Sequence, residues 1–243
     1  MKENNLISGI FNYCDRWCEK CGYSNKCLVY QKETERNIKH LLHDEDPDDP
    51  KVFAKDIEDN LTEALEYLHK MVDNAEDEKN FDFVDEKVQR SNFEMYELYR
   101  KSDEFFKDCF SLLKKIDFHL SLQKNELMLV NDEQKIMTEV SSLLSWYSPQ
   151  IFVKCKRAIS SLEELSANKN EEMEGFITES LNVTAKIAYL GIQNCLHALN
   201  DLYNLNNDFA DEALDVLTVC KNIEKELLKL FPHISNYKRP YFD

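Results

Sequence analysis

Glycine and proline are scarce in this sequence, which has only 4 Gly and 5 Pro among 243 residues. Average usage is about 7% Gly and about 5% Pro. A sheet protein of this length needs many turns rich in these residues, so the shortage argues against a fold of many strands. There is also no run of about 18 apolar residues that would span a membrane. The apolar stretch after Met1 is too short for a signal peptide. We therefore expect an all-α, cytoplasmic protein.

Clusters of basic residues are absent as well. The formal net charge is -16, which repels nucleic-acid phosphates and anionic membrane surfaces. We therefore expect no nucleic acid and no membrane among the partners, and a protein or redox partner with a basic face is the better expectation. The oligomeric state stays open. The most acidic run, residues 44–50, lacks the glycine and the distal glutamate of a calcium loop, so it is interpreted as a linker with helix-capping carboxylates.

Apolar residues recur at intervals of three and four along most of the chain, which predicts amphipathic helices. The expected helices cover residues 26–43, 50–72, 84–120, 136–165, 172–203 and 209–230. Ser102-Asp103 would split the third helix if it acts as an internal cap. The fourth keeps its phase across Pro149, which favours one kinked helix.

Short polar loops join the last four helices, and short loops make neighbouring helices antiparallel. The expected fold is therefore an up-and-down bundle of long helices with an N-terminal four-cysteine metal-binding segment. We divide the chain into residues 1–43 (the cysteine segment and first helix), 44–50 (the acidic linker) and 51–243 (the bundle and C-terminal tail). The helix near residues 51–75 and the N-terminal segment are expected to pack against the bundle.

Four cysteines within fourteen residues stand out: Cys14, Cys18, Cys21 and Cys27, spaced C-x3-C-x2-C-x5-C. Cytosolic thiols stay reduced unless they hold metal or do redox work. Four thiolates suit either tetrahedral Zn²⁺ or a [4Fe–4S] cluster. Structural zinc sites usually combine two C-x2-C pairs across a longer loop. This compact spacing with a single C-x2-C pair therefore favours the cluster, with zinc as the alternative.

Two known cluster loops are similar in spacing. Cys18-x2-Cys21-x5-Cys27 resembles the iron–sulfur loop of endonuclease III-type DNA glycosylases. That loop places its first cysteine six residues upstream and carries basic residues, so the resemblance implies a [4Fe–4S] cluster without DNA binding. Cys14-x3-Cys18-x2-Cys21 resembles the motif of radical SAM enzymes. Those enzymes place it on a β/α barrel, and this chain shows no strand pattern.

The whole chain also resembles a bacterial family of helical proteins that open with Tyr-Cys-Asp-Arg-Trp-Cys-Glu-x-Cys and have no assigned function. Three stretches carry this resemblance: residues 13–27, residues 145–158 from Ser145-Trp146-Tyr147 to Arg157-Ala158, and residues 238–243 at the C-terminal end. The resemblance implies an N-terminal cysteine site on a helical body and adds no activity.

Other cysteine, histidine and glutamate residues that could bind metal are expected to have structural roles. Cys109, Cys155, Cys195 and Cys220 lie on or near apolar stripes of different helices, which is typical of buried core cysteines. Glu66-x-x-His69 matches half of a di-iron signature. No second pair accompanies it, and the helical wheel places both residues near the surface. His40 and His43 fit a helix C-terminus, where the dipole favours cationic side chains.

The sequence therefore predicts a metal-binding protein that carries a [4Fe–4S] cluster on Cys14, Cys18, Cys21 and Cys27, with an electron-transfer or redox- or iron-sensing role. The alternative is a structural zinc site on a helical interaction module. An enzyme that uses the cluster or a bundle cavity stays open, although no P-loop, dinucleotide fingerprint or nucleophile elbow is present and no catalytic residue is assigned. Tyr13 and Trp17 would shield the cluster and Arg16 would offset its charge, or all three pack as ordinary side chains.

Overall fold

A computed structural model describes residues 6–73, 92–123, 131–167, 171–205 and 208–243. Within these ranges the chain forms helices and turns and no strand, which confirms the all-α expectation. The α-helices are α1 (Leu28–His43), α2 (Pro50–Asp73), α3 (Glu97–Gln123), α4 (Asp132–Ala167), α5 (Glu171–Asn204) and α6 (Ala210–Leu230). Short 3₁₀ helices are η1 (Ile10–Asn12), η2 (Cys18–Lys20), η3 (Ser24–Lys26) and η4 (Phe93–Met95).

Contacts divide the chain into two compact units. One comprises Met1–Phe11 and Cys18–Gln89 and contains α1 and α2; we call it the N-terminal unit. The other comprises Asn12–Trp17 and Arg90–Asp243 and contains α3 to α6; we call it the bundle unit. The boundaries expected from the sequence, with residues 51–243 in one domain, stay a prediction.

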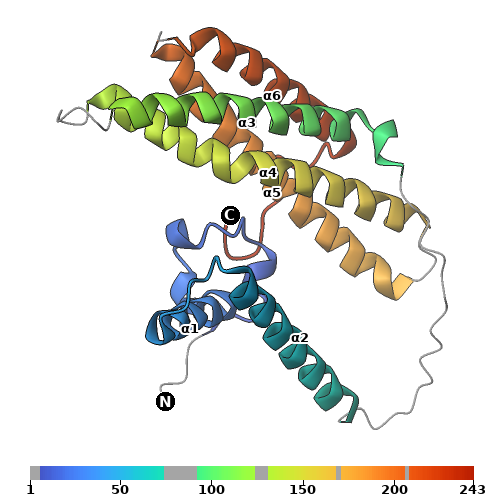
Figure 1. Cartoon of the computed structure of the whole chain (residues 1–243). Coiled ribbons are helices and arrows are strands. Elements are labelled where there is room, and N and C mark those ends of the chain that lie inside the picture. The colour runs from blue at the N-terminus through green and yellow to red at the C-terminus, as the bar shows by residue number, and fades with distance from the viewer. Residues whose placement is uncertain (1–5, 74–91, 124–130, 168–170, 206–207) are drawn as a thin grey trace. The chain divides into compact units, whose positions relative to one another are not determined.

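The bundle unit is an up-and-down arrangement of four long helices (Figure 1). Helix α3 contacts α4 and α6, and α5 contacts the same two helices, so the four close into a ring around one core. The largest fully buried side chains of this core come from all four helices and from the residue that follows α6: Leu98, Phe105, Leu112, Ile116, Met137, Leu144, Ile151, Ile159, Ile192, Leu199 and Phe231. The predicted bundle is therefore confirmed.

Local sequence explains where α4 begins and why it continues. The Asn131 side chain accepts a hydrogen bond from the Gln134 backbone N–H at 2.7 Å, and the Gln134 side chain accepts one from the Asn131 N–H at 3.1 Å. This reciprocal capping box satisfies two backbone donors at the helix start. Pro149 lies inside α4 without ending it, as the unbroken apolar phase predicted. Packing on α3 and α5 compensates for the backbone hydrogen bond that proline cannot donate.

Helices α4 and α5 approach closely at Gly191. A Cβ atom at this position would lie 3.2 Å from Ile151 Cγ1 and 3.2 Å from Tyr147 Cδ1. Ala185 and Ala188 lie on the same helix, and their small side chains are also buried. Small residues on α5 therefore let its backbone come near α4.

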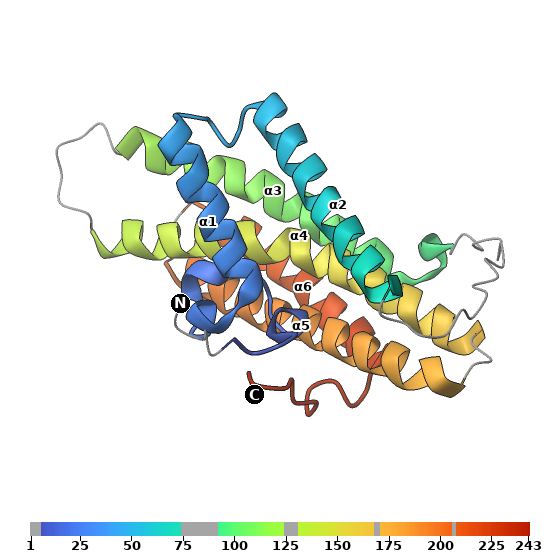
Figure 2. The same cartoon turned by 90° about the horizontal axis from the view of Figure 1, so that it is seen from below.

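In the N-terminal unit, α1 and α2 lie side by side and are joined by a short connection (Figures 1 and 2). Helix α1 ends in a Schellman motif, with Asp44 in the left-handed conformation at φ 55° and the Glu45 N–H bonded to the His40 carbonyl at 3.0 Å. The Asp49 carboxylate accepts a hydrogen bond from the Lys51 N–H at 2.7 Å and caps α2. Pro50 is therefore the first residue of α2, as predicted.

Polar side chains connect the two helices of this unit. Lys32 pairs with Glu63, and Arg36 donates a hydrogen bond to Asn60. Large apolar side chains stay exposed instead, including Leu41 and Leu42 on α1. The buried residues among those described in this unit are Ile10, Cys27 and His40. None of the helices in the described ranges is long and apolar enough to cross a membrane.

The third predicted helix differs from the structure at its start. Helix α3 begins at Glu97, after the turn η4, rather than at Val84. Residues 84–91 lie outside the described ranges. The helix runs unbroken past Ser102, whose hydroxyl donates to the Tyr99 carbonyl at 2.8 Å within the helix. The alternative of an internal cap at Ser102-Asp103 is therefore wrong.

Candidate metal centre

The segment from Cys18 to Cys27 is a chain of tight turns. The Cys21 N–H donates to the Cys18 carbonyl at 3.2 Å, and the Ser24 N–H donates to the Cys21 carbonyl at 3.4 Å. The Cys27 N–H then donates to the Ser24 carbonyl at 3.2 Å. Successive turns of this kind place three cysteines on one short, hydrogen-bonded stretch of backbone.

The Cys21 sulfur is itself a hydrogen-bond acceptor. The backbone N–H of Tyr23 donates to Cys21 Sγ with an N···S distance of 3.4 Å. Backbone donors aimed at a ligand sulfur stabilise its thiolate form and tune the metal that it binds. This turn therefore has the second-coordination contact that a thiolate ligand in a metal centre needs.

Cys27 occupies the N-cap position of α1. It is buried, with 8% of its surface exposed. The backbone before it is held from the N-terminal side, since the Ile7 N–H donates to the Lys26 carbonyl at 3.0 Å. Cys27 therefore lies at the positive end of the α1 dipole, where negatively charged groups are favoured in general.

In the bundle unit, Asn12–Trp17 is attached to α4 through Asp15. The Tyr147 hydroxyl donates to Asp15 Oδ2 at 2.8 Å, and Gln150 Nε2 donates to the Asp15 carbonyl at 2.7 Å. The other carboxylate oxygen, Oδ1, accepts the Trp17 N–H at 3.2 Å. Burial and the hydrogen bond to Asp15 raise the pKa of Tyr147, so its hydroxyl stays a donor at neutral pH.

Aromatic contacts add to this attachment. The Trp17 ring stacks on the Trp146 ring with a centroid separation of 5.3 Å and meets the edge of Tyr147 at 5.5 Å. The Tyr13 hydroxyl donates a hydrogen bond to Glu179 at 2.6 Å, and this bond and burial raise the pKa of Tyr13 to about 12. These contacts hold the residues on both sides of Cys14.

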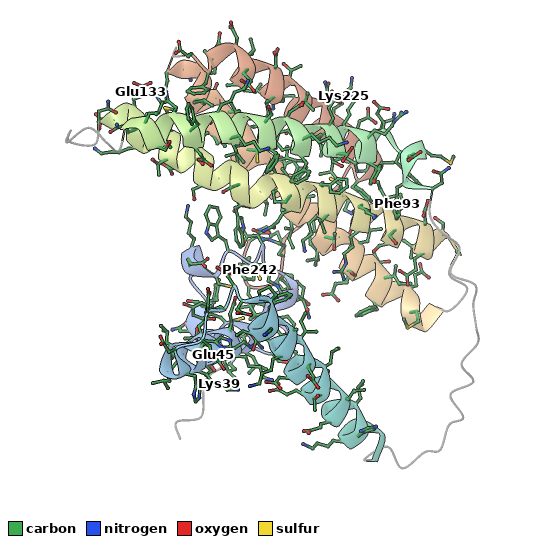
Figure 3. All side chains as sticks on the ribbon, in the orientation of Figure 1. Lys39, Glu45, Phe93, Glu133, Lys225 and Phe242 are labelled. Atoms are coloured by element: carbon green, nitrogen blue, oxygen red, sulfur yellow. The ribbon has the colours of Figure 1, made fainter. Side chains whose placement is uncertain are left out.

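The C-terminal tail completes this part of the bundle unit. Arg239 donates to the Tyr13 carbonyl at 3.3 Å and forms a two-point ion pair with Asp243, both at 2.9 Å. The Tyr241 ring meets the Tyr13 ring at 6.3 Å, edge to face. Arg239 also lies over the ring of Phe242, which Figure 3 labels. The three stretches of the family resemblance, 13–27, 145–158 and 238–243, thus supply residues that contact one another: Tyr13 and Trp17, Trp146 and Tyr147, and Arg239 and Tyr241.

Lys154 on α4 senses the charges of the segment that contains Cys14. Burial and then repulsion from Arg157 and Arg16 lower the pKa of Lys154, while Cys14 and Asp15 act in the opposite direction. Arg16 itself adopts the left-handed conformation, with φ 64°, which non-glycine residues adopt at some cost. Cationic side chains around a cysteine stabilise its thiolate.

Two buried polar atoms on α4 have no hydrogen-bond partner among the described residues: Trp146 Nε1 and Gln150 Oε1. An unpaired buried donor is uncommon in folded proteins. The indole N–H lies on the ring that stacks against Trp17, the residue before Cys18. Both orphaned atoms belong to the bundle unit, as does Cys14, and an unpaired N–H is able to donate a hydrogen bond to a further acceptor.

The structure places the four predicted ligands in two units. Cys14 belongs to the bundle unit, and Cys18, Cys21 and Cys27 belong to the N-terminal unit. Among the described residues, no three His, Cys, Asp or Glu side chains are arranged to hold one metal ion. None of the eight cysteines forms a disulfide. The four-cysteine centre therefore stays a prediction that rests on the spacing and on the local features above.

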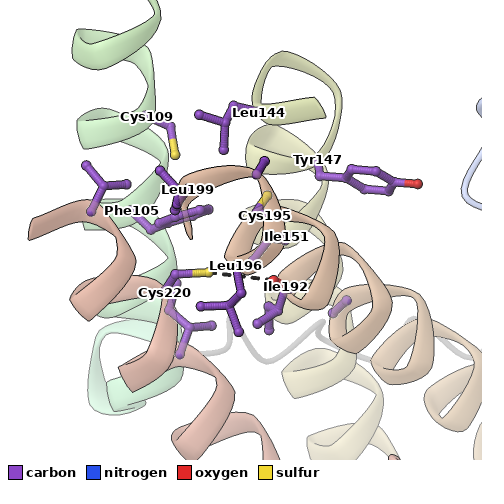
Figure 4. Close-up of a cluster of buried hydrophobic side chains, with 14 of the residues drawn as sticks. Phe105, Cys109, Leu144, Tyr147, Ile151, Ile192, Cys195, Leu196, Leu199 and Cys220 are labelled. Carbon is purple, nitrogen blue, oxygen red and sulfur yellow. Dashed lines mark hydrogen bonds between the residues drawn. The ribbon is translucent and has the colours of Figure 1, made fainter. Parts of the chain in front are cut away.

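The other four cysteines are core residues, as predicted. Cys109, Cys155, Cys195 and Cys220 come from α3, α4, α5 and α6 and are fully buried. Figure 4 shows three of them among large apolar side chains, with the Cys220 thiol donating to the Ile192 carbonyl at 3.8 Å. Burial raises the pKa of Cys155 to about 12, so this thiol stays protonated and unreactive at neutral pH.

His40 has a role that the sequence did not show. It is buried, and its two ring nitrogens lie 2.9 Å from a Glu45 oxygen and 3.0 Å from an Asp56 oxygen. These hydrogen bonds raise the pKa of His40. The only sequence indication was a histidine at a helix C-terminus followed by acidic residues.

Glu66 and His69 are exposed, as the helical wheel predicted, which removes the di-iron interpretation.

The sequence analysis also did not predict that Asp15 is hydrogen-bonded to Tyr147 and Gln150. Asp15 and Tyr147 lie within the stretches that carry the family resemblance, but nothing in their spacing indicates a contact between positions 132 residues apart.

A scan against protein-family models and searches of curated proteins and of solved structures found no match. The resemblances drawn from the sequence therefore stay predictions.

Proposed function

We propose that Cys14, Cys18, Cys21 and Cys27 hold a [4Fe–4S] cluster and that the protein serves electron transfer or redox or iron sensing. The observation that carries this proposal is the hydrogen bond from the Tyr23 N–H to Cys21 Sγ, formed within successive turns that contain the C-x2-C pair. A [4Fe–4S] cluster, when bound, supplies reversible one-electron transfer. The protein would contribute the thiolates, their hydrogen bonds and the charges around them.

The chain length between ligands is compatible with one centre. Three residues lie between Cys14 and Cys18, so the four steps from one to the other span at most about 14 Å even when fully extended. The attachment of Asp15 to Tyr147 and Gln150 would orient Cys14. Arg16 and Lys154 would offset the negative charge of the ligated cluster, and Trp17 would limit the access of water.

A structural zinc site is the second candidate, and the small core of the N-terminal unit favours it. Only Ile10, Cys27 and His40 are buried among the residues described there. Units with so little buried surface often depend on a metal for folding. Four cysteines around one Zn²⁺ would stabilise this unit without any redox role.

Metal content of the full chain purified without oxygen distinguishes the two candidates. The cluster predicts a coloured protein with about four iron and four sulfide per chain and a reversible one-electron wave. A colourless protein with about one zinc per chain refutes the cluster and supports the structural site. Protein that binds neither metal with its cysteines reduced refutes both.

A pair of variants assigns the ligands. Cys21→Ser should abolish or strongly reduce the bound metal, because it removes the thiolate that accepts the Tyr23 N–H. Cys155→Ala is the matched control, since this cysteine is buried in the bundle core. It should keep the metal content of the unsubstituted protein. Equal metal loss in both variants would contradict the assignment.

A further inference from the structure

Residues 239–243 of the C-terminal tail fold back on themselves. The Asp243 carboxylate accepts the Arg239 backbone N–H at 3.0 Å, Nε at 2.9 Å and Nη2 at 2.9 Å. The Arg239 carbonyl accepts the N–H groups of Phe242 and Asp243, both at 3.3 Å. Tyr241 lies inside this turn in the left-handed conformation, with φ 72°. Non-glycine residues keep such a backbone only where the surrounding contacts over-determine it, so the turn is well specified.

The turn aims one edge of the Arg239 guanidinium out of the tail. Nε and Nη2 bind Asp243, and Nη1 donates to the Tyr13 carbonyl at 3.3 Å. The Arg239 side chain is only 11% exposed, and its guanidinium carbon lies 5.1 Å from the centre of the Phe242 ring. A planar guanidinium that is held at two points presents its remaining donors in a fixed direction.

The Tyr13 carbonyl belongs to the peptide bond that leads into Cys14. The Tyr241 ring contacts the Tyr13 ring at 6.3 Å, so the turn meets Tyr13 at a second point. On the other side of Cys14, the Asp15 carbonyl accepts a hydrogen bond from Gln150 Nε2 at 2.7 Å. All of these residues belong to the bundle unit. The backbone around Cys14 is therefore held by the tail before it and by α4 after it.

We propose that residues 239–243 form a strap that fixes Cys14 and that Arg239 is the positioning residue of this strap. The use of Cys14 as a metal ligand rests on the proposed function, whereas the strap itself does not. The other three candidate ligands belong to the N-terminal unit and lie on hydrogen-bonded turns of their own. The strap therefore controls the geometry of one ligand without altering the other three.

The tail before the strap is attached independently of it. Phe231 and Ile234 are buried in the bundle core. Between that core and the strap, Lys186 of α5 donates to the Ser235 carbonyl at 2.8 Å. Substitution of Arg239 should therefore loosen the strap and leave the earlier tail and the four-helix core in place.

Alkylation of the reduced, metal-free full chain tests the strap, with the rate at each cysteine read by peptide mass spectrometry. Losing a hydrogen bond to a charged group changes a local opening equilibrium by about tenfold or more, and since Cys14 is already partly exposed its labelling should quicken at least about threefold in Arg239→Gln. Loss of a nearby cation alone would disfavour the thiolate and slow the reaction, so faster labelling reports a lost constraint.

Two further variants separate geometry from charge. Arg239→Lys keeps the charge but cannot form the two-point pair with Asp243, so it should quicken Cys14 labelling as Arg239→Gln does. Lys238→Gln is the matched control, because Lys238 is exposed in the same tail and its loss should leave the rate unchanged. If the Arg239 variants fold poorly by circular dichroism, Asp243→Asn weakens the same pair more mildly and should produce a smaller increase.

Metal retention connects the strap to the metal centre. In full chain purified without oxygen, Arg239→Gln should release its metal to a chelator faster than the unsubstituted chain. Cys14→Ser should also speed this release. If Arg239 acts through Cys14, combining the two substitutions should add nothing to the effect of Cys14→Ser, because the two residues then belong to one coupled unit.

Unchanged Cys14 labelling in every well-folded variant of the Arg239–Asp243 pair would overturn the strap, as would an equal increase in Lys238→Gln. A parallel increase at the buried Cys155 would assign the effect to unfolding of the bundle and would also overturn it. Additive metal release in the double variant would refute action through Cys14. A chain that binds no metal but shows the expected labelling refutes the proposed metal centre and supports the strap, so the two failures are distinguishable.

Discussion

The two glycines of α5 should respond to alanine in opposite ways. Gly175 is exposed, and a Cβ atom there would meet nothing within 4 Å. Alanine is about 1 kcal/mol more favourable than glycine inside a helix. Gly175→Ala should therefore raise the free energy of unfolding by about 1 kcal/mol. Gly191→Ala gains the same helix propensity but places its Cβ atom 3.2 Å from both Ile151 and Tyr147.

Neither neighbour of Gly191 can move easily. Ile151 is fully buried, and the Tyr147 ring is held by its hydrogen bond to Asp15 and by the edge contact with Trp17. Overpacking of a closely packed core costs about 1–3 kcal/mol. After the propensity gain, Gly191→Ala should lower the free energy of unfolding by about 1 kcal/mol. The two variants should thus differ by about 2 kcal/mol.

Chemical unfolding followed by circular dichroism measures this difference, and thermal melts should differ by about 4–8 °C at the usual 2–4 °C per kcal/mol. The fluorescence of Trp17 and Trp146 gives a local readout, since their stacked rings adjoin Tyr147. It should change in Gly191→Ala and stay constant in Gly175→Ala. If Gly191→Ala is as stabilising as Gly175→Ala, the close approach of α4 and α5 at this residue is refuted.

Three further outcomes follow from the buried polar groups. Because the folded-state pKa of His40 is raised above its unfolded value, its stabilisation is fully present below about pH 6.5 and is lost as pH rises through the folded pKa. Hydrogen exchange of α1 should therefore quicken with pH beyond its intrinsic trend, and a His40→Gln variant that keeps this extra slope would contradict the assignment. Tyr147→Phe removes a hydrogen bond to a charged acceptor and should lower the unfolding free energy by about 1.5–3 kcal/mol; an unchanged denaturant midpoint would count against it. In native metal-free protein at pH 8, alkylation and mass spectrometry should find Cys155 unmodified, since burial raises its pKa to about 12, while Cys21, which is partly exposed, reacts; rapid labelling of Cys155 would refute the closed core.

The elements that periodicity predicted well are those whose apolar residues are buried in the bundle. Helix α4 continues across Pro149, and α6 ends at Leu230, both as predicted from the sequence. The core cysteines were also predicted, because a cysteine on an apolar stripe behaves as a small hydrophobe. In these cases one segment contains all the information that the prediction needs.

The features that were missed depend on contacts between distant segments. The hydrogen bond between Asp15 and Tyr147 joins residues 132 positions apart, and no local pattern specifies it. His40 was interpreted as a helix-end residue. Its burial depends on the left-handed turn at Asp44, which brings Glu45 back toward the helix, and on Asp56 from α2. Such groups are found only when the backbone that positions them is known.

The apolar stripe of α2 shows the limit of periodicity in another way. The pattern of Phe53, Ile57, Leu61 and Leu65 predicted a helix with one face to bury, and the helix forms. The pattern does not state what covers that face. In the structure these side chains stay exposed. Amphipathicity therefore predicts a need for a partner, and only the spatial arrangement shows whether a neighbouring segment meets it.

The N-terminal unit has little buried surface to offset the cost of ordering its chain. Ordering one residue costs about 1–2 kcal/mol of backbone entropy, and the described part of this unit buries only Ile10, Cys27 and His40 to offset it. The buried His40 with its two carboxylates fixes the geometry of α1 and α2, but such pairs add little net stability because their charges lose solvation. If the cysteines hold a metal, as proposed, that metal should supply part of the missing stabilisation. Chelation of the full chain should then increase hydrogen exchange in α1 and α2, and unchanged protection of both helices in metal-free protein would contradict this role.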